Sequence, residues 1–155
     1  MVQARLDVSQ VLGQACSTPA RPERNGGQLA RDGVPVREPV RHQRVRSLIT
    51  EPTGEEDVAV GDLAIRGMAW SGQAPIERVE VSIGDGPWRT ARLIGERHRH
   101  CWQWWELLVH LDGPAETTVR ARATDLAGRT QPEQPEWNRL GYAGNGIQVV
   151  AICVR

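Results

Sequence analysis

The sequence predicts an all-β domain of two antiparallel sheets over residues 47–155, preceded by a disordered tail over residues 1–46. Three observations predict this organisation. Short segments alternate apolar and polar residues with the period of 2 that a half-buried strand shows. Turn sequences separate these segments, and no long segment carries the 3.6-residue period of an amphipathic helix. A chain of 155 residues is long enough for one domain with its own core.

The tail is predicted from composition, which changes near Arg46. The segment CSTPARPERNGGQLARDGVPVREPVRHQR is rich in Pro, Arg and Gly, lacks aromatic residues and shows no hydrophobic period. So little apolar surface does not offset the entropy that a chain loses on ordering. Eight Arg against four acids give residues 1–46 a net charge of +4, so a basic arm that binds nucleic acid is the alternative. Interleaved Pro and acidic residues, and the lack of aromatics, favour a solvated tail.

Two segments predict the first strands. LAIRGMAW, residues 63–70, alternates apolar and polar side chains at its start. ERVEVSIGDGPW is clearer, because its apolar residues Val79, Val81 and Ile83 share one face. The GDG turn then leads into a partner strand that is predicted over Trp88–Ile94.

Three further strands follow. CWQWWELLVHL is predicted as a strand over residues 101–111, and TTVRARATD as another over residues 117–125. DLAGR makes the next turn, because Asp125 bonds to nearby backbone and Gly128 tolerates a positive φ. GIQVVAICVR, residues 146–155, closes the chain as a strand. Together these strands and turns indicate an immunoglobulin-like antiparallel β-sandwich.

The stretch HRHCWQWWE, residues 98–106, sets two His and a Cys beside three Trp, which raises the question of a metal site or a base-stacking platform. In the predicted strand Trp102 and Trp104 face one side and Trp105 faces the other. A zinc site takes four ligands, and the chain offers no second ligand pair, so polar residues at a strand entrance are favoured. Eleven Arg against fifteen acids give residues 47–155 a charge of −4, which opposes a polyanion. The tryptophans are therefore expected to fill the core or a protein interface.

The totals for the whole chain argue against several other classes. Nineteen basic and nineteen acidic residues give a formal net charge of zero, so neither nucleic acid nor membrane is expected as a partner. No apolar run is long enough to span a bilayer and no signal peptide is evident, so a cytoplasmic location is the default expectation. No G-x-S-x-G, P-loop or G-x-G-x-x-G motif occurs, and the acidic residues 55–57 are interpreted as a solvated turn. A binding or assembly module is favoured over an enzyme, and neither a catalytic residue nor a metal site is predicted.

Six fragments follow one another along the chain: RSLITEP, IRGMAWSG, IERVEVSIGDGPWRTARL, WQWWE, RATDLAGRTQP and WNRLGYAGN. In this order, ahead of a final strand, they resemble the C-terminal dimerisation domain of sulfite-oxidase-type molybdenum-cofactor oxidoreductases. The resemblance covers about residues 45–155. It implies an immunoglobulin-like sandwich that pairs with a second copy into a homodimer. In that family a preceding catalytic domain holds molybdopterin, and a cysteine thiolate binds the molybdenum.

The resemblance does not bring a cofactor into this chain. Only residues 1–46 precede the sandwich, which is too short for a molybdenum domain, and Cys16 lies in a context unlike the family's ligand motif. Cys101 and Cys153 are expected to act as small buried hydrophobes in sandwich strands. We therefore expect no cofactor and no catalysis from this chain alone, with a molybdenum-domain subunit as a further partner. A truncated gene or a misassigned start is the hypothesis for the short tail.

One family residue is carried over by position. In animal members an arginine shortly after a Trp-Asn pair reaches the anionic substrate pocket, in the order Trp-Asn-x-Arg-Gly. Here the order is WNRLG over residues 137–141, which places Arg139 one position earlier. In extended backbone a shift of one residue turns a side chain to the opposite side. A surface or interface role is therefore expected for Arg139, and substrate binding is the alternative.

The final strand predicts self-association, because apolar residues occupy both of its faces: Ile147, Val149, Ala151 and Cys153 on one, and Val150, Ile152 and Val154 on the other. A sandwich strand needs only one apolar face for its own core. A two-fold homodimer is therefore predicted, with an interface at Val150, Ile152, Val154, Trp102 and Trp104. Val150→Asp is expected to dissociate it. The alternative is a stand-alone module that binds a protein or ligand with its tryptophan-rich strand.

Overall fold

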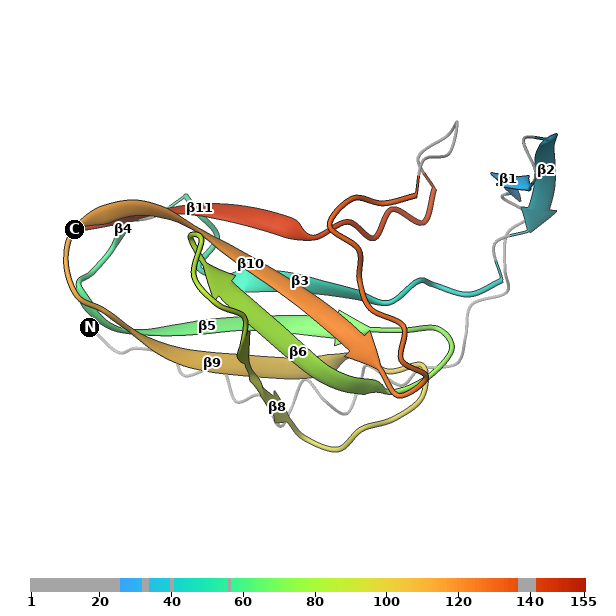
Figure 1. The fold of residues 1–155 in the computed structure, drawn as a ribbon. Coiled ribbons are helices and arrows are strands. Elements are labelled where there is room, and N and C mark those ends of the chain that lie inside the picture. Colours follow the sequence, from blue (N-terminus) through green and yellow to red (C-terminus); the bar gives the residue numbers. More distant parts are fainter. Residues whose placement is uncertain (1–25, 32–33, 40, 56, 137–141) are drawn as a thin grey trace.

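A sandwich of two sheets packed face to face forms most of the protein in a computed structural model, which describes residues 26–31, 34–39, 41–55, 57–136 and 142–155 (Figure 1). The β5/β9 sheet has the order β3-β5-β9-β8, with strands β3 (Arg46–Glu51), β5 (Gly61–Trp70), β9 (Gln103–Leu111) and β8 (Arg92–Ile94). The β6/β10 sheet has the order β4-β11-β10-β6-β7, with strands β4 (Asp57–Val58), β11 (Gln148–Val154), β10 (Ala115–Asp125), β6 (Ile76–Ile83) and β7 (Arg89–Thr90). Neighbouring strands are antiparallel except β4 and β11. No helix occurs among the described residues, and the predicted sandwich is confirmed.

Two strands lie ahead of the sandwich, within the segment predicted as a tail. β1 (Gly26–Arg31) and β2 (Val34–Pro39) pair in antiparallel fashion. The hairpin lies within residues 1–46, the segment for which composition predicts a tail, and that prediction stays untested as a whole. An Asp-Gly pair stands between the two strands in the sequence, and this dipeptide is typical of short hairpin loops. Residues 1–25 lie outside the described part of the chain.

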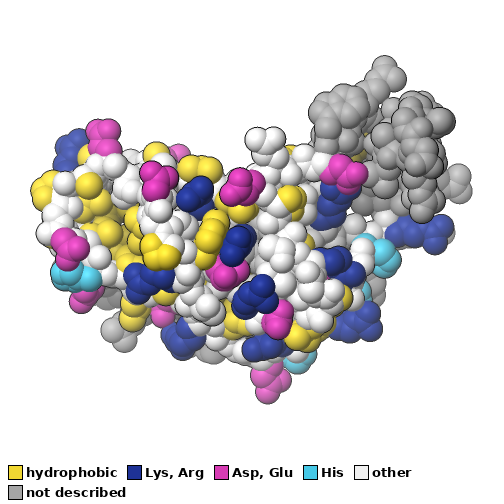
Figure 2. Space-filling model, in the orientation of Figure 1, with side chains coloured by type: hydrophobic (Ala, Val, Ile, Leu, Met, Phe, Trp, Pro, Cys, Tyr) yellow, Lys and Arg dark blue, Asp and Glu magenta, His cyan; other side chains and the backbone are white. Residues whose placement is uncertain are grey.

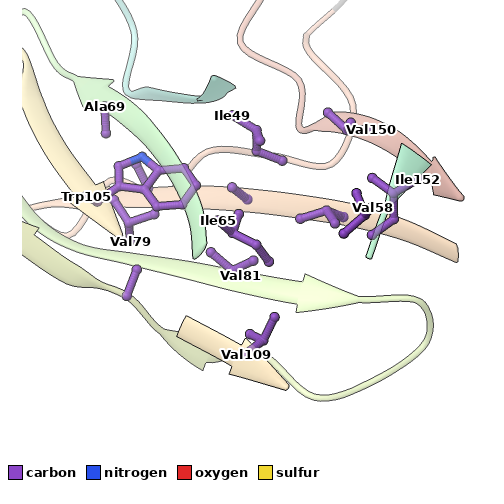
Figure 3. Packing of buried hydrophobic residues seen from close by; sticks show 14 of the residues in the cluster. Ile49, Val58, Ile65, Ala69, Val79, Val81, Trp105, Val109, Val150 and Ile152 are labelled. Atoms are coloured by element: carbon purple, nitrogen blue, oxygen red, sulfur yellow. The ribbon is translucent and has the colours of Figure 1, made fainter. Parts of the chain in front are cut away.

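The core lies between the two sheets and is filled by alternate residues of each strand. Trp105 and Ile65 from the β5/β9 sheet meet Val79, Val81 and Val119 from the β6/β10 sheet, and all five are fully buried. Figure 3 shows the Trp105 ring among the aliphatic side chains of both sheets. Each buried aliphatic side chain contributes about 1.5–3 kcal/mol through removal of apolar surface from water. The alternation predicted for these strands is thereby confirmed.

A single glycine makes room for the Trp105 ring. A Cβ atom at Gly67 would lie 2.1 Å from the Leu48 carbonyl oxygen and 2.3 Å from Trp105 Cζ2. No real Cβ is accommodated at such distances, because the neighbouring backbone of β3 does not yield as a flexible side chain does. Gly67 therefore lets the backbone of β5 lie directly against the indole.

The chain changes sheets at Ala91, which corrects the strand predicted over Trp88–Ile94. β7 pairs with β6 through only two residues, and β8 then pairs with β9 in the opposite sheet. Ala91 is buried between the two strands, and its N–H donates to the Val79 carbonyl at 2.8 Å. β7 and β8 are edge strands of their sheets, so the crossing closes one side of the sandwich, and the small Ala91 side chain is buried there.

Asp125 organises the turn after β10 from a fully buried position. Its carboxylate accepts hydrogen bonds from Ser71 Oγ at 2.8 Å, from the Arg129 guanidinium, and from the backbone N–H groups of Ala127 and Arg129. Gly128 takes φ +78°. The turn predicted for DLAGR is therefore confirmed, and Asp125 is its anchor.

Two glutamine amides satisfy the open edge of β3. Gln131 Oε1 accepts from the Ser47 N–H at 2.8 Å, and Gln148 Oε1 accepts from the Ile49 N–H at 2.9 Å. Gln131 also accepts from the Ala123 N–H and donates to the Gly146 carbonyl. These amides take the place of a neighbouring strand, so they tie β3 to the opposite sheet and to the segment before β11.

Candidate assembly interface

The tryptophan-rich strand presents two different faces. Gln103, Trp105 and Val109 point into the core, whereas Trp104, Glu106 and Leu108 point outward from the β5/β9 sheet. Leu108 is 65% exposed and Trp102, just before the strand, is 52% exposed. Two of the predicted interface residues, Trp102 and Trp104, thus lie on the outer face of this sheet.

Apolar side chains cross this outer face from strand to strand. The residue pairing places Leu48 of β3 beside Met68 of β5, Met68 beside Trp104 of β9, and Trp104 beside Ile94 of β8. Beside this row the Trp70 and Trp102 rings lie 6.4 Å apart between centroids, tilted by 41°. The sequence pattern identifies the tryptophans of β9 but not their cross-strand neighbours, because the pattern of one strand does not reveal which strand lies alongside it.

A row of alternating charges lies next to the apolar row. Arg66 bonds to both Glu51 and Glu106, each at 2.8 Å, and Arg92 bonds to the other oxygen of Glu106 at 2.9 Å. The hydrogen bond from Arg66, followed by that from Arg92, holds the pKa of Glu106 below its ordinary value. Glu106 is therefore held in its charged form between the two arginines.

The far end of the same face carries a second acid–base pair. His110 Nδ1 lies 2.7 Å from the Asp62 carboxylate, and both side chains are exposed. The hydrogen bond to Asp62 is the main reason that the pKa of His110 lies above its ordinary value. The outer face thus ends in a pair that gains positive charge on β9 as the pH falls.

Three of the predicted interface residues lie elsewhere, which corrects the assignment made for the last strand. Val150, Ile152 and Val154 are 5%, 3% and 2% exposed and belong to the monomer's own core. They point inward because β11 pairs with β10 in a register that sets Val150 opposite the core residue Val119. The opposite face of β11 is the outward one, where Val149 is 60% exposed.

The outer face of the β6/β10 sheet has a different character. Arg122 lies 4.3 Å from the centroid of the Trp88 ring and Arg120 lies 5.6 Å from it. Arg122 also pairs with Glu80, while Arg120 donates to the Gly84 carbonyl and Ser82 Oγ. The loop after β6 therefore covers part of this face, and arginines cover the indole. Figure 2 shows basic and acidic side chains interspersed over the face in view.

The polar residues ahead of β9 form an exposed loop. The strand begins at Gln103, later than predicted, so His98 and His100 precede it, and both are exposed. Among the described residues no three His, Cys, Asp or Glu side chains gather where they could share a metal ion. Cys101 and Cys153 are half-buried rather than core residues, since Cys153 lies on the outward face of β11.

A hollow of about 520 Å³ lies at the end of the sandwich where the chain enters β3. Its lining includes Gln43, Arg44, Ser71, Gln73, Arg129 and Asn145. Arg44 pairs with Glu136 and Arg129 pairs with Asp125, so these charges are balanced within the chain. Arg139 lies outside the described residues, and its role stays a prediction.

The fold and this face define the chain as a β-sandwich domain of the immunoglobulin-like class with an exposed, partly apolar sheet face. Residues 37–154 match the family described as the Mo-co oxidoreductase dimerisation domain. The chain belongs to this family.

Relatives carry the same domain within longer proteins. Human mitochondrial sulfite oxidase is 37% identical over 119 residues, which span 71% of this chain and 22% of the relative. Sulfite oxidase of Gallus gallus is 35% identical over 105 residues, spanning 63% and 23%. The NADH nitrate reductase of Chlorella vulgaris is 35% identical over 111 residues, spanning 65% and 35%. The chain thus spans less than a quarter of the two sulfite oxidases.

A solved structure agrees with the family assignment. The sulfane dehydrogenase SoxCD from Paracoccus pantotrophus aligns with a TM-score of 0.68 and 30% identity, covering 83% of this chain and 36% of that chain. The shared segment accounts for the sandwich. In the described part of this chain no helix is long and apolar enough to cross a membrane.

Proposed function

We propose that this chain is an assembly domain that forms a homodimer and that, in doing so, serves a molybdenum domain of the sulfite-oxidase type. The observation that carries the proposal is the exposed outer face of the β5/β9 sheet, in a chain whose family is described as a dimerisation domain. An apolar face with a charged row resembles the composition of protein interfaces, where an apolar centre has a polar surround.

Light scattering coupled to size exclusion tests the homodimer directly. We expect a mass near twice the 17.2 kDa of one chain at micromolar concentration. A mass that stays at 17.2 kDa up to high micromolar concentration would remove the homodimer from the proposal.

The molybdenum-domain partner is tested separately. A molybdenum domain of a sulfite oxidase relative, purified without its own dimerisation domain, is passed over the immobilised chain. Retention of that domain, but not of unrelated proteins of similar charge, supports the partnership. Equal passage of both sets counts against it.

A stand-alone binding module is the second candidate, and the exposed Trp70–Trp102 pair favours it. Aromatic rings of this kind supply contact area for a ligand or another protein. A monomeric chain that fails to retain a molybdenum domain would leave this candidate in place of the first.

A further inference from the structure

The outer face of the β5/β9 sheet is organised in rows that run across the strands. Side chains on directly opposed residues stand next to each other, so each row contains one residue from each strand that it crosses. From one end of the face to the other, the pairing gives these rows: Arg46, Trp70 and Trp102; Leu48, Met68, Trp104 and Ile94; Glu51, Arg66, Glu106 and Arg92; Ala64 and Leu108; Asp62 and His110. The row of Met68 and Trp104 and the row of Ala64 and Leu108 are apolar, and the charged row of Arg66 and Glu106 lies between them.

The two charged rows have the same symmetry: acidic and basic residues exchange places across the line between β5 and β9. The longer row reads negative, positive, negative, positive from β3 to β8. The end row has Asp62 on β5 and His110 on β9, and this histidine is positive when it is protonated. In each row, a charge on one side of the midline has the opposite charge at the equivalent place on the other side. When such a row is laid in reversed order over the same row of a second copy, each charge meets an opposite charge.

We infer that two copies pair face to face through this surface, about a two-fold axis that runs parallel to the strands between β5 and β9. The inference rests on the proposed homodimer and names its interface. The rotation lays each row over the same row of the second copy in reversed order. Glu51 then meets Arg92 of the partner subunit, and Arg66 meets Glu106 of the partner subunit. The apolar rows meet in the same way, Met68 against Trp104 of the partner subunit.

The charges also select this axis over the other one available to a face-to-face dimer. An axis that runs along the charged row would lay every residue of that row over its own copy. Glu51 would then oppose Glu51 of the partner subunit, and Arg92 would oppose Arg92 of the partner subunit. Opposed like charges in an interface destabilise the complex, whereas opposed unlike charges favour it and fix its register. Aligned packing of two sheets is a common arrangement.

The opposite sheet offers no comparable surface. On its outer face Arg122 stands opposite Glu80, but Arg120 stands opposite Ser82, Arg78 opposite Thr124 and Glu116 opposite Cys153, so no row of alternating charges crosses the strands there. The loop after β6 further covers Ser82, which accordingly is buried. Val149 is the large apolar residue of β11 that is exposed there, beside the smaller Ala151, and it provides a matched control for the face that we assign.

A charge-swap experiment on the full chain tests the axis. Glu51→Arg and Arg92→Glu are measured singly and together, with dimer dissociation followed by sedimentation velocity. Each single reversal sets two pairs of like charges against each other and should weaken the dimer about tenfold. The double variant restores opposite charges across the axis and should bring affinity back near wild type. Residues 51 and 92 lie on opposite edge strands, roughly 14 Å apart from three strand spacings, so this rescue does not arise within one copy.

Two apolar-to-charged variants test the face itself. Leu108→Asp should dissociate the dimer, whereas Val149→Asp, at a similarly exposed site on the other sheet, should leave it intact. Circular dichroism confirms that both variants keep the fold. If the wild type is a dimer but the double variant is not rescued, this interface is wrong and the proposed homodimer remains. The same holds if Val149→Asp dissociates the dimer and Leu108→Asp does not. A monomeric wild type overturns both.

Discussion

Asp125 combines full burial with a negative charge, and it keeps that charge through its partners. Burial alone is the largest single influence and favours the neutral form. Hydrogen bonds from Ser71, from Arg129 and from two backbone N–H groups together outweigh it, so the pKa of Asp125 lies below its ordinary value. Removing the charge of a buried carboxylate of this kind strongly destabilises the fold, because its hydrogen-bond donors lose their acceptor.

Asp125→Asn should lower the free energy of unfolding by about 3 kcal/mol, because an amide nitrogen would face hydrogen-bond donors. Urea denaturation followed by circular dichroism measures the change. Asp85→Asn, in the exposed turn after β6, is the matched control and should change stability by less than about 0.5 kcal/mol. Equal effects of the two variants would contradict the anchoring role.

The same carboxylate predicts how stability depends on acid. A pKa that is lower in the folded than in the unfolded protein stabilises the fold above the unfolded pKa, and this contribution is lost as the pH falls through the folded pKa. The stability difference between wild type and Asp125→Asn should therefore shrink as the pH is lowered below about 4. Unfolding free energies measured from pH 7 downward test this expectation, and a difference that does not change would count against it.

Gly67 is the residue at which an added methyl group should be most damaging. Gly67→Ala places a Cβ against the Leu48 carbonyl and the Trp105 ring, so we expect a loss of about 3 kcal/mol or failure to fold. Gly113→Ala is the control, because nothing lies within 4 Å of a Cβ built there. Thermal unfolding of both variants gives the comparison. A stable Gly67→Ala protein would show that β5 and the indole move apart readily.

The side-chain amide of Gln131 accepts hydrogen bonds that the edge strand β3 would otherwise give to a neighbouring strand, so it should contribute measurably to stability. Gln131→Ala leaves the buried N–H groups of Ser47 and Ala123 without their acceptor, which should cost about 2–4 kcal/mol. Gln134→Ala, at an exposed position close by, is the matched control and should be nearly neutral. Hydrogen exchange at the Ser47 amide measures the effect at this one site, because loss of its acceptor should make the exchange faster. Unchanged exchange would mean that another group replaces Gln131.

The strands themselves could be predicted from the sequence, but their neighbours could not. Alternation in residues 77–83 and 117–125 identifies inward and outward faces, because the period of a strand is a local property. Which face of β11 points inward is not a local property, since apolar residues occupy both of its sides. Only the pairing of Val150 with Val119 of β10 sends Val150 inward. The sheet change at Ala91 likewise depends on the packing of two sheets.

The candidate interface was predicted in part for the same reason. Trp102 and Trp104 are recognisable as outward residues of one strand. Their row with Leu48, Met68 and Ile94 exists only once three other strands lie beside β9. The charged row is equally a product of pairing, because its members are far apart in the sequence.

For the whole molecule, a homodimer links stability to protein concentration. Association that favours the folded chain stabilises it by mass action, so the Tm should rise as the protein concentration is raised. Differential scanning calorimetry over a hundredfold range of concentration measures this. The Leu108→Asp variant should show no such rise, because it removes the assigned face while leaving the monomer core untouched. A Tm that is independent of concentration in the wild type would contradict the linkage.

The unequal surroundings of Trp102 and Trp105 give the protein two optical reporters. Trp105 is fully buried in an apolar core, so its emission should lie at short wavelength and shift to the red when the core opens. Trp102 is half exposed in a single copy, so a small neutral quencher such as acrylamide reaches it there, whereas a second copy on the sheet face would shield it. The two signals therefore report different events in one sample. A red shift of the emission reports loss of the core, and increased quenching reports exposure of the sheet face.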